Sequence, residues 1–146
     1  MSDKLNIIVK PIAFVKNKYK EAKGSIPKDA ISEIVLIDSI PEDSFEGIDE
    51  FSHLEIIFHF HKASKIITGT AYPRNNMNNP KVGIYSHRRK DRPNPIGLTL
   101  VKLIKREGRK LIISGLDALD GTPILDVKPV VDRFLPQEKI KQPDWV

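Results

Sequence analysis

The sequence predicts a mostly β fold, a single-domain, closed or nearly closed β-barrel with one or two short helical turns. Its 146 residues make one typical domain, long enough to bury a core. Apolar residues fall in short runs rich in Ile and Val, or alternate with polar residues at the strand period. Eleven prolines and eight glycines separate these runs, which is typical of short strands joined by turns. Closure into a barrel would remove exposed sheet edges.

The N-terminal half contains two expected strands and one helical turn. Residues 6–16 are rich in Ile and Val and predict a first strand, in which Pro11 marks an edge position or a bulge. Residues 31–38 predict a second strand. Residues 41–45 predict one helical turn, because proline stands near its start and acidic residues occupy its first turn.

Residues 53–61 show the clearest alternation in the chain and predict a half-buried strand. Every second side chain is then expected on the core face. That face holds Leu54, Ile56, Phe58 and Phe60, and the opposite face holds His53, Glu55, Ile57, His59 and His61.

The C-terminal half predicts four further strands. Residues 82–86 form a short one, and residues 97–105 and 110–115 flank Glu107-Gly108, a dipeptide typical of a tight hairpin. Residues 124–128 form the last. One more helical turn is expected in the C-terminal tail.

Composition narrows the class of protein. The chain has no cysteine, which excludes disulfides, thiolate metal sites and cysteine nucleophiles and fits a reducing compartment. The start, Met1 to Lys4, does not resemble a signal peptide. No apolar stretch approaches the ~20 residues needed to cross a bilayer. We therefore expect a cytoplasmic protein without a membrane partner.

Charge is distributed unevenly along the chain, whose formal net charge is +5. Residues 29–55 carry nine acidic side chains and no lysine or arginine, whereas residues 81–110 carry ten basic side chains against Asp91 and Glu107. A concentrated basic segment suits a polyanion, because each cation placed at a phosphate releases condensed counterions. A solvated basic face is the alternative interpretation.

The usual nucleotide-binding turns are absent from the sequence. It contains neither GxGxxG nor GxxxxGK[ST], and it lacks the G-x-S-x-G of acyl-transfer serines. A nucleotide-like cofactor would therefore have to bind without a Rossmann crevice.

Residues 85–97 are the densest functional feature. Pro93 and Pro95 fix their own φ and hold the residues before them in extended geometry, which predicts a stiff, non-helical turn. Arginine suits bidentate contacts with phosphate or carboxylate. The alternative is a rigid surface turn with solvated cations. The candidate residues for contacts with a nucleic acid are Arg88, Arg89, Lys90 and Arg92.

Carboxylates follow the strand that ends near residue 115. Asp117 and Asp120 would lie at its end and in its exit turn, where a carboxylate accepts hydrogen bonds from an amine, a ribose or a base edge. Asp-Gly and Thr-Pro are also ordinary turn residues. From the residues alone, turn formation is preferred for Asp120, and both interpretations stay open for Asp117.

The polar face of residues 53–61 offers an alternative metal site. Two histidines at i and i+2 near a carboxylate are metal ligands on some barrel strands. A complete site needs at least three converging ligands, so we predict no metal site. The cupin-like metal enzyme that remains as an alternative would use His53, Glu55, His59 and His61.

Several stretches together resemble the TsaA-like family, also called TrmO, of S-adenosylmethionine-dependent tRNA adenine N6-methyltransferases with a β-barrel fold. The resemblance runs through most of the chain, and Arg-Pro-Asn-Pro-Ile-Gly followed by Asp-Gly-Thr-Pro is its most specific part. The matching stretches are residues 51–54, 58–61, 83–85, 92–98, 115–117 and 119–129, together with Arg88.

The resemblance implies a cofactor, a substrate and a set of site residues. The cofactor is S-adenosylmethionine, and the substrate is the tRNA anticodon stem-loop, methylated on N6 of the threonylcarbamoyl-modified adenosine 3′ of the anticodon. It also implies a homodimer. Asp117 is the expected catalytic residue. The cofactor-binding residues implied are Pro27, Lys28, Asp29, His61, Lys62, Arg88, Leu98, Ser114, Gly115, Leu116 and Asp117. A basic RNA-binding module without catalysis is the other alternative.

Overall fold

The computed structural model describes residues 4–21 and 24–146. The expectation that the chain does not start with a signal peptide falls partly on Met1 to Asp3, which lie outside the described residues. Eight strands and five short 3₁₀ helices follow along the described residues. The strands are β1 (Ala13–Lys16), β2 (Ile31–Leu36), β3 (His53–His59), β4 (Thr70–Ala71), β5 (Val82–Gly83), β6 (Ile96–Glu107), β7 (Lys110–Ser114) and β8 (Pro123–Pro129). The helices are η1 (Glu42–Phe45), η2 (Ile48–Glu50), η3 (Pro73–Asn75), η4 (Ile84–Ser86) and η5 (Asp132–Phe134).

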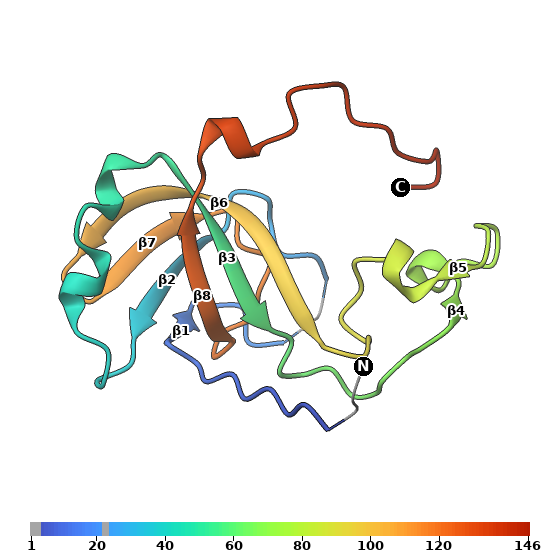
Figure 1. Ribbon diagram of the computed structural model, residues 1–146, viewed down its shortest axis with the longest axis horizontal. Helices are drawn as coiled ribbons and strands as arrows, with labels where there is room; N and C mark the ends of the chain where they lie inside the picture. The colour runs from blue at the N-terminus through green and yellow to red at the C-terminus, as the bar shows by residue number, and fades with distance from the viewer. Residues whose placement is uncertain (1–3, 22–23) are drawn as a thin grey trace.

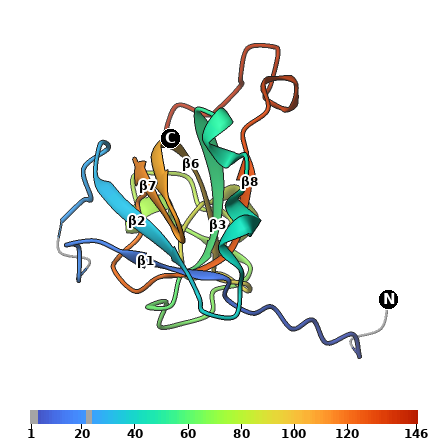
Figure 2. The same ribbon diagram turned by 90° about the vertical axis from the view of Figure 1, so that its left-hand side faces the viewer.

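Six strands form a closed antiparallel barrel in the order β1-β2-β7-β6-β3-β8 (Figures 1 and 2). Pairing of Ala13 with Ile124 joins β1 to β8 and closes it. Closure gives every barrel strand two neighbours and leaves the sheet without a free edge. The prediction of a mostly β, closed barrel with short helical turns is confirmed.

The inward-facing side chains of β3 form part of the core. Leu54, Ile56 and Phe58 point into the barrel and are no more than 1% exposed, as the sequence predicts. They pack with apolar side chains from the other five barrel strands. Burial of such side chains, at about 25 cal/mol per Å² of apolar surface, is the main stabilisation of a fold this small.

The first expected strand is wrong over residues 6–12. Only Ala13–Lys16 forms β1, and Ile7, Ile8 and Val9 are each more than half exposed. Ladder pairing with β2 and β8 begins only at Ala13, although the backbone of Ile12 also bonds to Ile124 and Ile37. Pro11 also has no N–H to donate to a ladder.

Other expected strands change in extent. The strands expected over residues 31–38 and 53–61 end at Leu36 and His59. The short strand expected over residues 82–86 ends at Gly83, where the chain turns into η4. The strand expected from Gly97 begins at Ile96 and continues to Glu107. The hairpin between β6 and β7 is confirmed, and Gly108 supplies its positive φ of 58°. The helical turn expected in the tail is η5.

A small lobe stands beside the barrel (Figure 1). It consists of the two-stranded β4–β5 sheet with the flanking turns η3 and η4, and it belongs to the segment between β3 and β6. The C-terminal segment leaves β8, passes through η5 and returns to this lobe, where Trp145 and Pro73 line one pocket. No helix in residues 4–21 and 24–146 is long and apolar enough to cross a membrane.

Candidate functional site

The site is built on the place where β6 begins beside the end of β3. Gly97 pairs with Phe58, and its missing side chain leaves room for the phenylalanine ring. A Cβ at residue 97 would lie only 2.4 Å from Phe58 Cζ. The ring of Phe58 in turn meets that of Phe60 edge to face, with centroids 5.1 Å apart. These two rings form a fixed aromatic wall.

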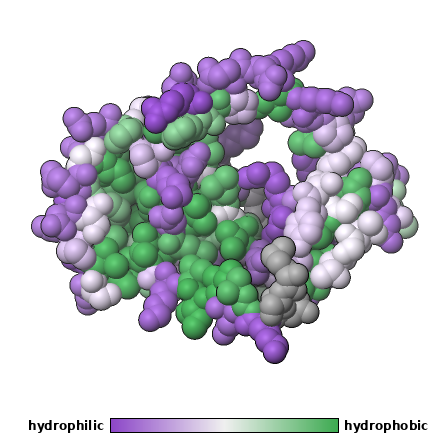
Figure 3. Space-filling model, in the orientation of Figure 1, coloured by the Kyte–Doolittle hydropathy of each residue, from purple (hydrophilic) through white to green (hydrophobic). Residues whose placement is uncertain are grey.

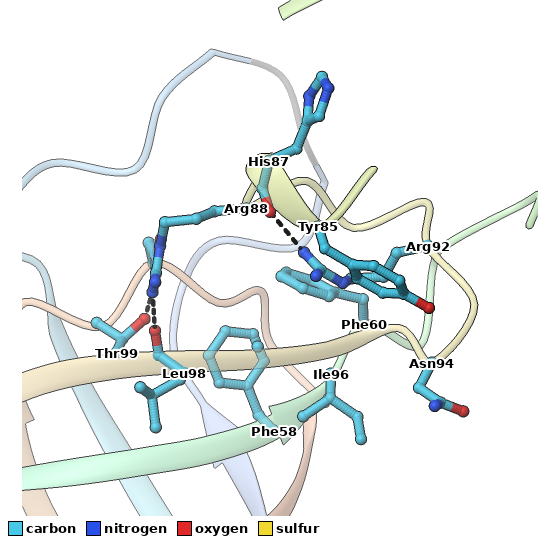
Figure 4. Close-up of a pocket in the computed structure, with 12 residues that line it drawn as sticks. Phe58, Phe60, Tyr85, His87, Arg88, Arg92, Asn94, Ile96, Leu98 and Thr99 are labelled. Atoms are coloured by element: carbon cyan, nitrogen blue, oxygen red, sulfur yellow. Dashed lines mark hydrogen bonds between the residues drawn. The ribbon is translucent and has the colours of Figure 1, made fainter. Parts of the chain in front are cut away.

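A cleft of about 520 Å³, the basic cleft, opens on one side of this wall (Figure 4). Arg88 donates from Nη2 to the carbonyl oxygen of Leu98 over 2.9 Å, and Arg92 donates from Nη1 to the carbonyl oxygen of His87 over 2.9 Å. These bonds hold two guanidinium groups along the cleft. Its other lining residues include Tyr85, Asn94, Thr99 and Asp117.

Tyr85 gives the basic cleft an exposed aromatic face. Its side chain is 78% exposed although it is large and apolar, and the Arg92 guanidinium carbon lies 6.0 Å from the ring centroid. A cation over one face orients the ring. Such a ring is suited to stacking on a planar ligand.

A second cleft of about 250 Å³, the apolar cleft, lies on the other side of the wall. Its lining is mainly apolar and includes Ile26, Ala118 and Leu119, with His61, Lys62 and Thr122 as polar members. Phe58, Phe60 and Asp117 line both clefts. The two clefts therefore share one wall, and Asp117 is the ionisable group on it.

Local structure after β7 directs Asp117 toward this wall. Gly115 has a φ of 98°, which favours glycine, and a Cβ there would come within 3.3 Å of the Lys28 carbonyl oxygen. Leu116 is fully buried and anchors the segment in the core. Thr99 donates its hydroxyl to Oδ1 of Asp117 over 2.6 Å. Within residues 4–21 and 24–146, Oδ2 of Asp117 has no hydrogen-bond partner, so it is available to a ligand.

His61 adds a titratable group to the apolar cleft. Partial desolvation lowers the pKa of His61 below its ordinary value of 6.5, and the charges of Lys62 and His59 lower the pKa further. The Lys62 ammonium donates to the carbonyl oxygen of Lys20 over 2.7 Å. At neutral pH the imidazole is uncharged, so the cleft presents a neutral ring.

The lowered pKa of His61 predicts a loss of stability on acidification. The unfolded chain takes up this proton near pH 6.5 and the folded chain only at lower pH, so stability falls as pH drops through that interval. We expect His61→Gln to flatten the fall in Tm between about pH 7 and about pH 5.5. Thermal unfolding at several pH values measures this, and equal slopes for both proteins would contradict it.

The structure separates the sequence-predicted cofactor residues. His61, Lys62 and Asp117 line the apolar cleft, whereas Arg88, Leu98 and Asp117 line the basic cleft. Leu116 is fully buried and lines neither cleft, so it can act only by anchoring the segment that carries Asp117.

The loop of Pro27, Lys28 and Asp29 lines neither of the two clefts. Pro27 and Asp29 border a separate pocket with Lys18 and Tyr19. Ser114 connects this loop to the site, because its hydroxyl donates to the Asp29 carbonyl oxygen over 3.3 Å.

The side chains of the four basic residues of the stiff turn also point to different sites. Arg88 and Arg92 face the basic cleft, and Lys90 lines the apolar cleft. Arg89 turns away toward the lobe and donates to Oδ1 of Asn75 over 3.4 Å. The sequence alone does not distinguish the four.

The strand face proposed for the alternative metal enzyme lacks a converging set of ligands. No group of three or more His, Asp or Glu side chains capable of holding a metal occurs among the described residues. His53 instead meets the Ser52 hydroxyl at 2.7 Å from Nδ1, at the far end of β3 from His59. This geometry does not favour the cupin-like alternative.

The fold and site define a class: small closed β-barrels with two clefts beside a basic turn. Comparison with known proteins places the chain within it. Residues 14–134 match the family model described as the tRNA-methyltransferase O N-terminal domain. The chain belongs to this family, and the resemblance noted from the sequence is confirmed.

Curated relatives and solved structures agree with this assignment. A probable S-adenosyl-L-methionine-binding protein of Pyrococcus abyssi is 37% identical over 94% of this chain and 75% of its own. The human tRNA (adenine(37)-N6)-methyltransferase is 33% identical over 94% of this chain but only 33% of its own length. The crystal structure of TrmO from Pseudomonas aeruginosa superposes with a TM-score of 0.78 at 27% identity, over 98% of this chain and 63% of that one.

Proposed function

We propose that the protein binds S-adenosylmethionine and transfers its methyl group to tRNA, at N6 of the threonylcarbamoyl-modified adenosine 3′ of the anticodon. One observation carries the proposal: the two clefts share the wall of Phe58, Phe60 and Asp117. A cofactor in one cleft and an acceptor in the other would meet there. The names of the Pyrococcus and human relatives support the cofactor and the acceptor.

The apolar cleft fits the cofactor. When bound, the cofactor supplies an electrophilic methyl group on a cationic sulfonium. The mainly apolar lining suits an adenine ring, and a neutral His61 avoids repelling a cation. Asp117 offers Oδ2 as an acceptor for an amine or a ribose hydroxyl, while Thr99 holds Oδ1. We assign Lys62 and the segment from Ser114 to Asp117 to the same pocket.

Pro27, Lys28 and Asp29 would act on the cofactor through that segment. The Lys28 carbonyl oxygen packs against Gly115, and Ser114 bonds to Asp29. These residues would fix the backbone on which Asp117 stands.

The basic cleft fits the acceptor nucleotide. The threonylcarbamoyl group ends in a carboxylate, for which a guanidinium is the favoured partner, and Arg88 and Arg92 are held along the cleft. Tyr85 offers an exposed ring for base stacking. Anticodon-loop bases are single-stranded and can turn outward onto such a surface.

Methyl transfer also requires loss of the N6 proton. The nitrogen forms a bond to the methyl carbon as the carbon–sulfur bond breaks, and the proton leaves the nitrogen. Asp117 is the carboxylate nearest both clefts and would accept that proton through Oδ2. Positioning by the aromatic wall would supply much of the remaining rate acceleration.

The outer face of the barrel supports a homodimer as the working form, and the absence of cysteine fits the reducing cytoplasm as its location. Figure 3 shows apolar residues gathered over the barrel strands. Ile96, Leu98, Leu100 and Ile104 point outward from β6, each at least 40% exposed. An exposed apolar face of this kind, here interrupted by Lys102, is typical of an interaction surface. Leu98 also lines the basic cleft, so a partner on this face would lie beside the site.

The reaction is tested with labelled S-adenosylmethionine and two synthetic anticodon stem-loops, with and without the threonylcarbamoyl group. We expect label only in the modified RNA, and nucleoside mass spectrometry should place the new methyl on N6 of that adenosine. Methylation of both RNAs would support methyl transfer to RNA but would contradict the threonylcarbamoyl-modified adenosine as the required acceptor. RNA binding with a steep salt dependence but no transfer would favour the non-catalytic RNA-binding module.

A further inference from the structure

A further pocket lies where the stiff turn meets the β4–β5 lobe. It has a volume of about 550 Å³ and is called the lobe pocket here. Arg74 and Asn75 line it from η3, residues 86–91 line it from the turn, and Trp145 lines it from the C-terminal segment. In Figure 1 that segment passes from the barrel across to the lobe. Nothing in the proposed transfer uses this pocket.

Two buried polar atoms in its lining have no hydrogen-bond partner among the described residues. They are Nε of Arg89 and Oδ1 of Asp91, and Asp91 is only 6% exposed. A buried polar group without a partner costs free energy, and such groups are rare in folded proteins. A ligand that offers an acceptor to Arg89 and a donor to Asp91 would remove both penalties once the side chains turn toward it.

The backbone beside these atoms is also unusual. Arg74 and Asn75 have φ values of 54° and 56°, in the left-handed region that side chains other than glycine seldom adopt. The conformation places the Asn75 carboxamide oxygen within 3.4 Å of the Arg89 guanidinium. Strained residues of this kind persist where the surrounding structure holds them, and they gather at binding sites.

We propose that the lobe pocket binds an unpaired nucleobase of the RNA next to the acceptor nucleotide. This proposal rests on the proposed function. Trp145 offers an aromatic face for stacking, Arg74 and Arg89 offer cations for phosphate, and Asp91 accepts from an N–H on a base edge. A simple anion would leave Trp145 and Asp91 unused, and an apolar ligand would leave the arginines unused.

The position of Arg88 makes the two sites neighbours. Arg88 lines both the basic cleft and the lobe pocket, and His87 lines both as well. An RNA loop that crosses the stiff turn at Arg88 would place the acceptor in the basic cleft and an adjacent base in the lobe pocket. The turn thus separates two consecutive nucleotides of one strand.

Trp145 provides a direct test, because it is the only tryptophan in the chain. The intact protein, without cofactor, is titrated with an unmodified anticodon stem-loop RNA and with a fully paired RNA of the same length. Tryptophan fluorescence reports RNA binding in the lobe pocket, and the fluorescence anisotropy of an end-labelled RNA reports total RNA binding. We expect saturable quenching by the stem-loop RNA and not by the paired RNA, with matching affinities from both signals.

Variants separate stacking from general electrostatics. Trp145→Ala and Arg89→Ala should each weaken stem-loop binding about tenfold, whereas Trp145→Phe should keep it. Arg133→Ala, an exposed arginine over Phe134, is the matched charge control and should change affinity little. S-adenosylmethionine affinity should be unchanged in all four.

Failure of this proposal is distinct from failure of the proposed function. The stem-loop RNA could bind, and its threonylcarbamoyl-modified form could be methylated, without any change in Trp145 fluorescence and with native RNA affinity in Arg89→Ala. In that case the lobe pocket is not an RNA subsite, and the proposed methyltransferase function stands. If neither RNA binds and none is methylated, both proposals fall.

Discussion

Replacing Arg88 by alanine is expected to lower kcat/KM for methyl transfer by about one to two orders of magnitude, the loss typical of removing a hydrogen bond to a charged group. Arg88 is exposed, and its one hydrogen bond goes to the Leu98 carbonyl oxygen. The substitution therefore removes a guanidinium from the basic cleft without leaving a core cavity. The stem-loop with its threonylcarbamoyl group is the substrate on which the loss should appear.

The controls for Arg88 distinguish site chemistry from general charge. Arg133→Ala removes the same charge at a distance from both clefts and should keep near-native activity. Unfolding of Arg88→Ala in urea should match the native protein within about 0.5 kcal/mol, as surface substitutions do. Arg88→Ala with full activity would remove Arg88 from the site.

Gly97→Ala is expected to destabilise the fold by about 1–3 kcal/mol, the usual cost of overpacking a well-packed core. The added Cβ would lie 2.4 Å from Cζ and 2.5 Å from Cε2 of Phe58, whose side chain is 1% exposed. The ring must move, and it forms the wall between the clefts. Cofactor binding should therefore weaken together with stability.

Gly83→Ala is the matched control for this substitution. A Cβ at Gly83 would meet only the Gly69 carbonyl oxygen at 3.9 Å, and the backbone φ there is −60°. Its effect should be near zero or slightly stabilising, because alanine restricts the unfolded chain. Urea midpoints at constant m-value measure both variants. Equal midpoints for the two would show that the Phe58 ring has room to move.

The barrel could be predicted because its core follows from local pattern. Alternation over residues 53–61 assigns Leu54, Ile56 and Phe58 to the interior, and Glu107-Gly108 fixes the neighbouring hairpin. The same reasoning failed for residues 6–12. Their Ile and Val content suits a strand, but a strand also needs a partner, and ladder pairing with β2 and β8 begins only at Ala13.

The site could be predicted only in part, because its geometry depends on pairing between distant segments. The bond from Thr99 to Asp117 joins β6 to the segment after β7, and no local pattern connects them. The alternation assigns Phe58 and Phe60 to the core, and it does not show that their rings also line two clefts. Arg89 diverges from Arg88 because it turns toward the lobe. The lobe could not be predicted, because each of its strands has only two residues and shows too little pattern.

Calorimetric titration of S-adenosylmethionine into the purified protein, beside Asp117→Ala, tests the central claim most directly. We predict saturable binding that the substitution weakens at least tenfold, the usual loss when a hydrogen bond to a charged group is removed. Binding with equal affinity in both proteins would take Asp117 out of the cofactor site. The absence of any heat of binding at millimolar cofactor, with or without tRNA, would contradict the methyltransferase function. It would leave the non-catalytic RNA-binding module as the favoured hypothesis.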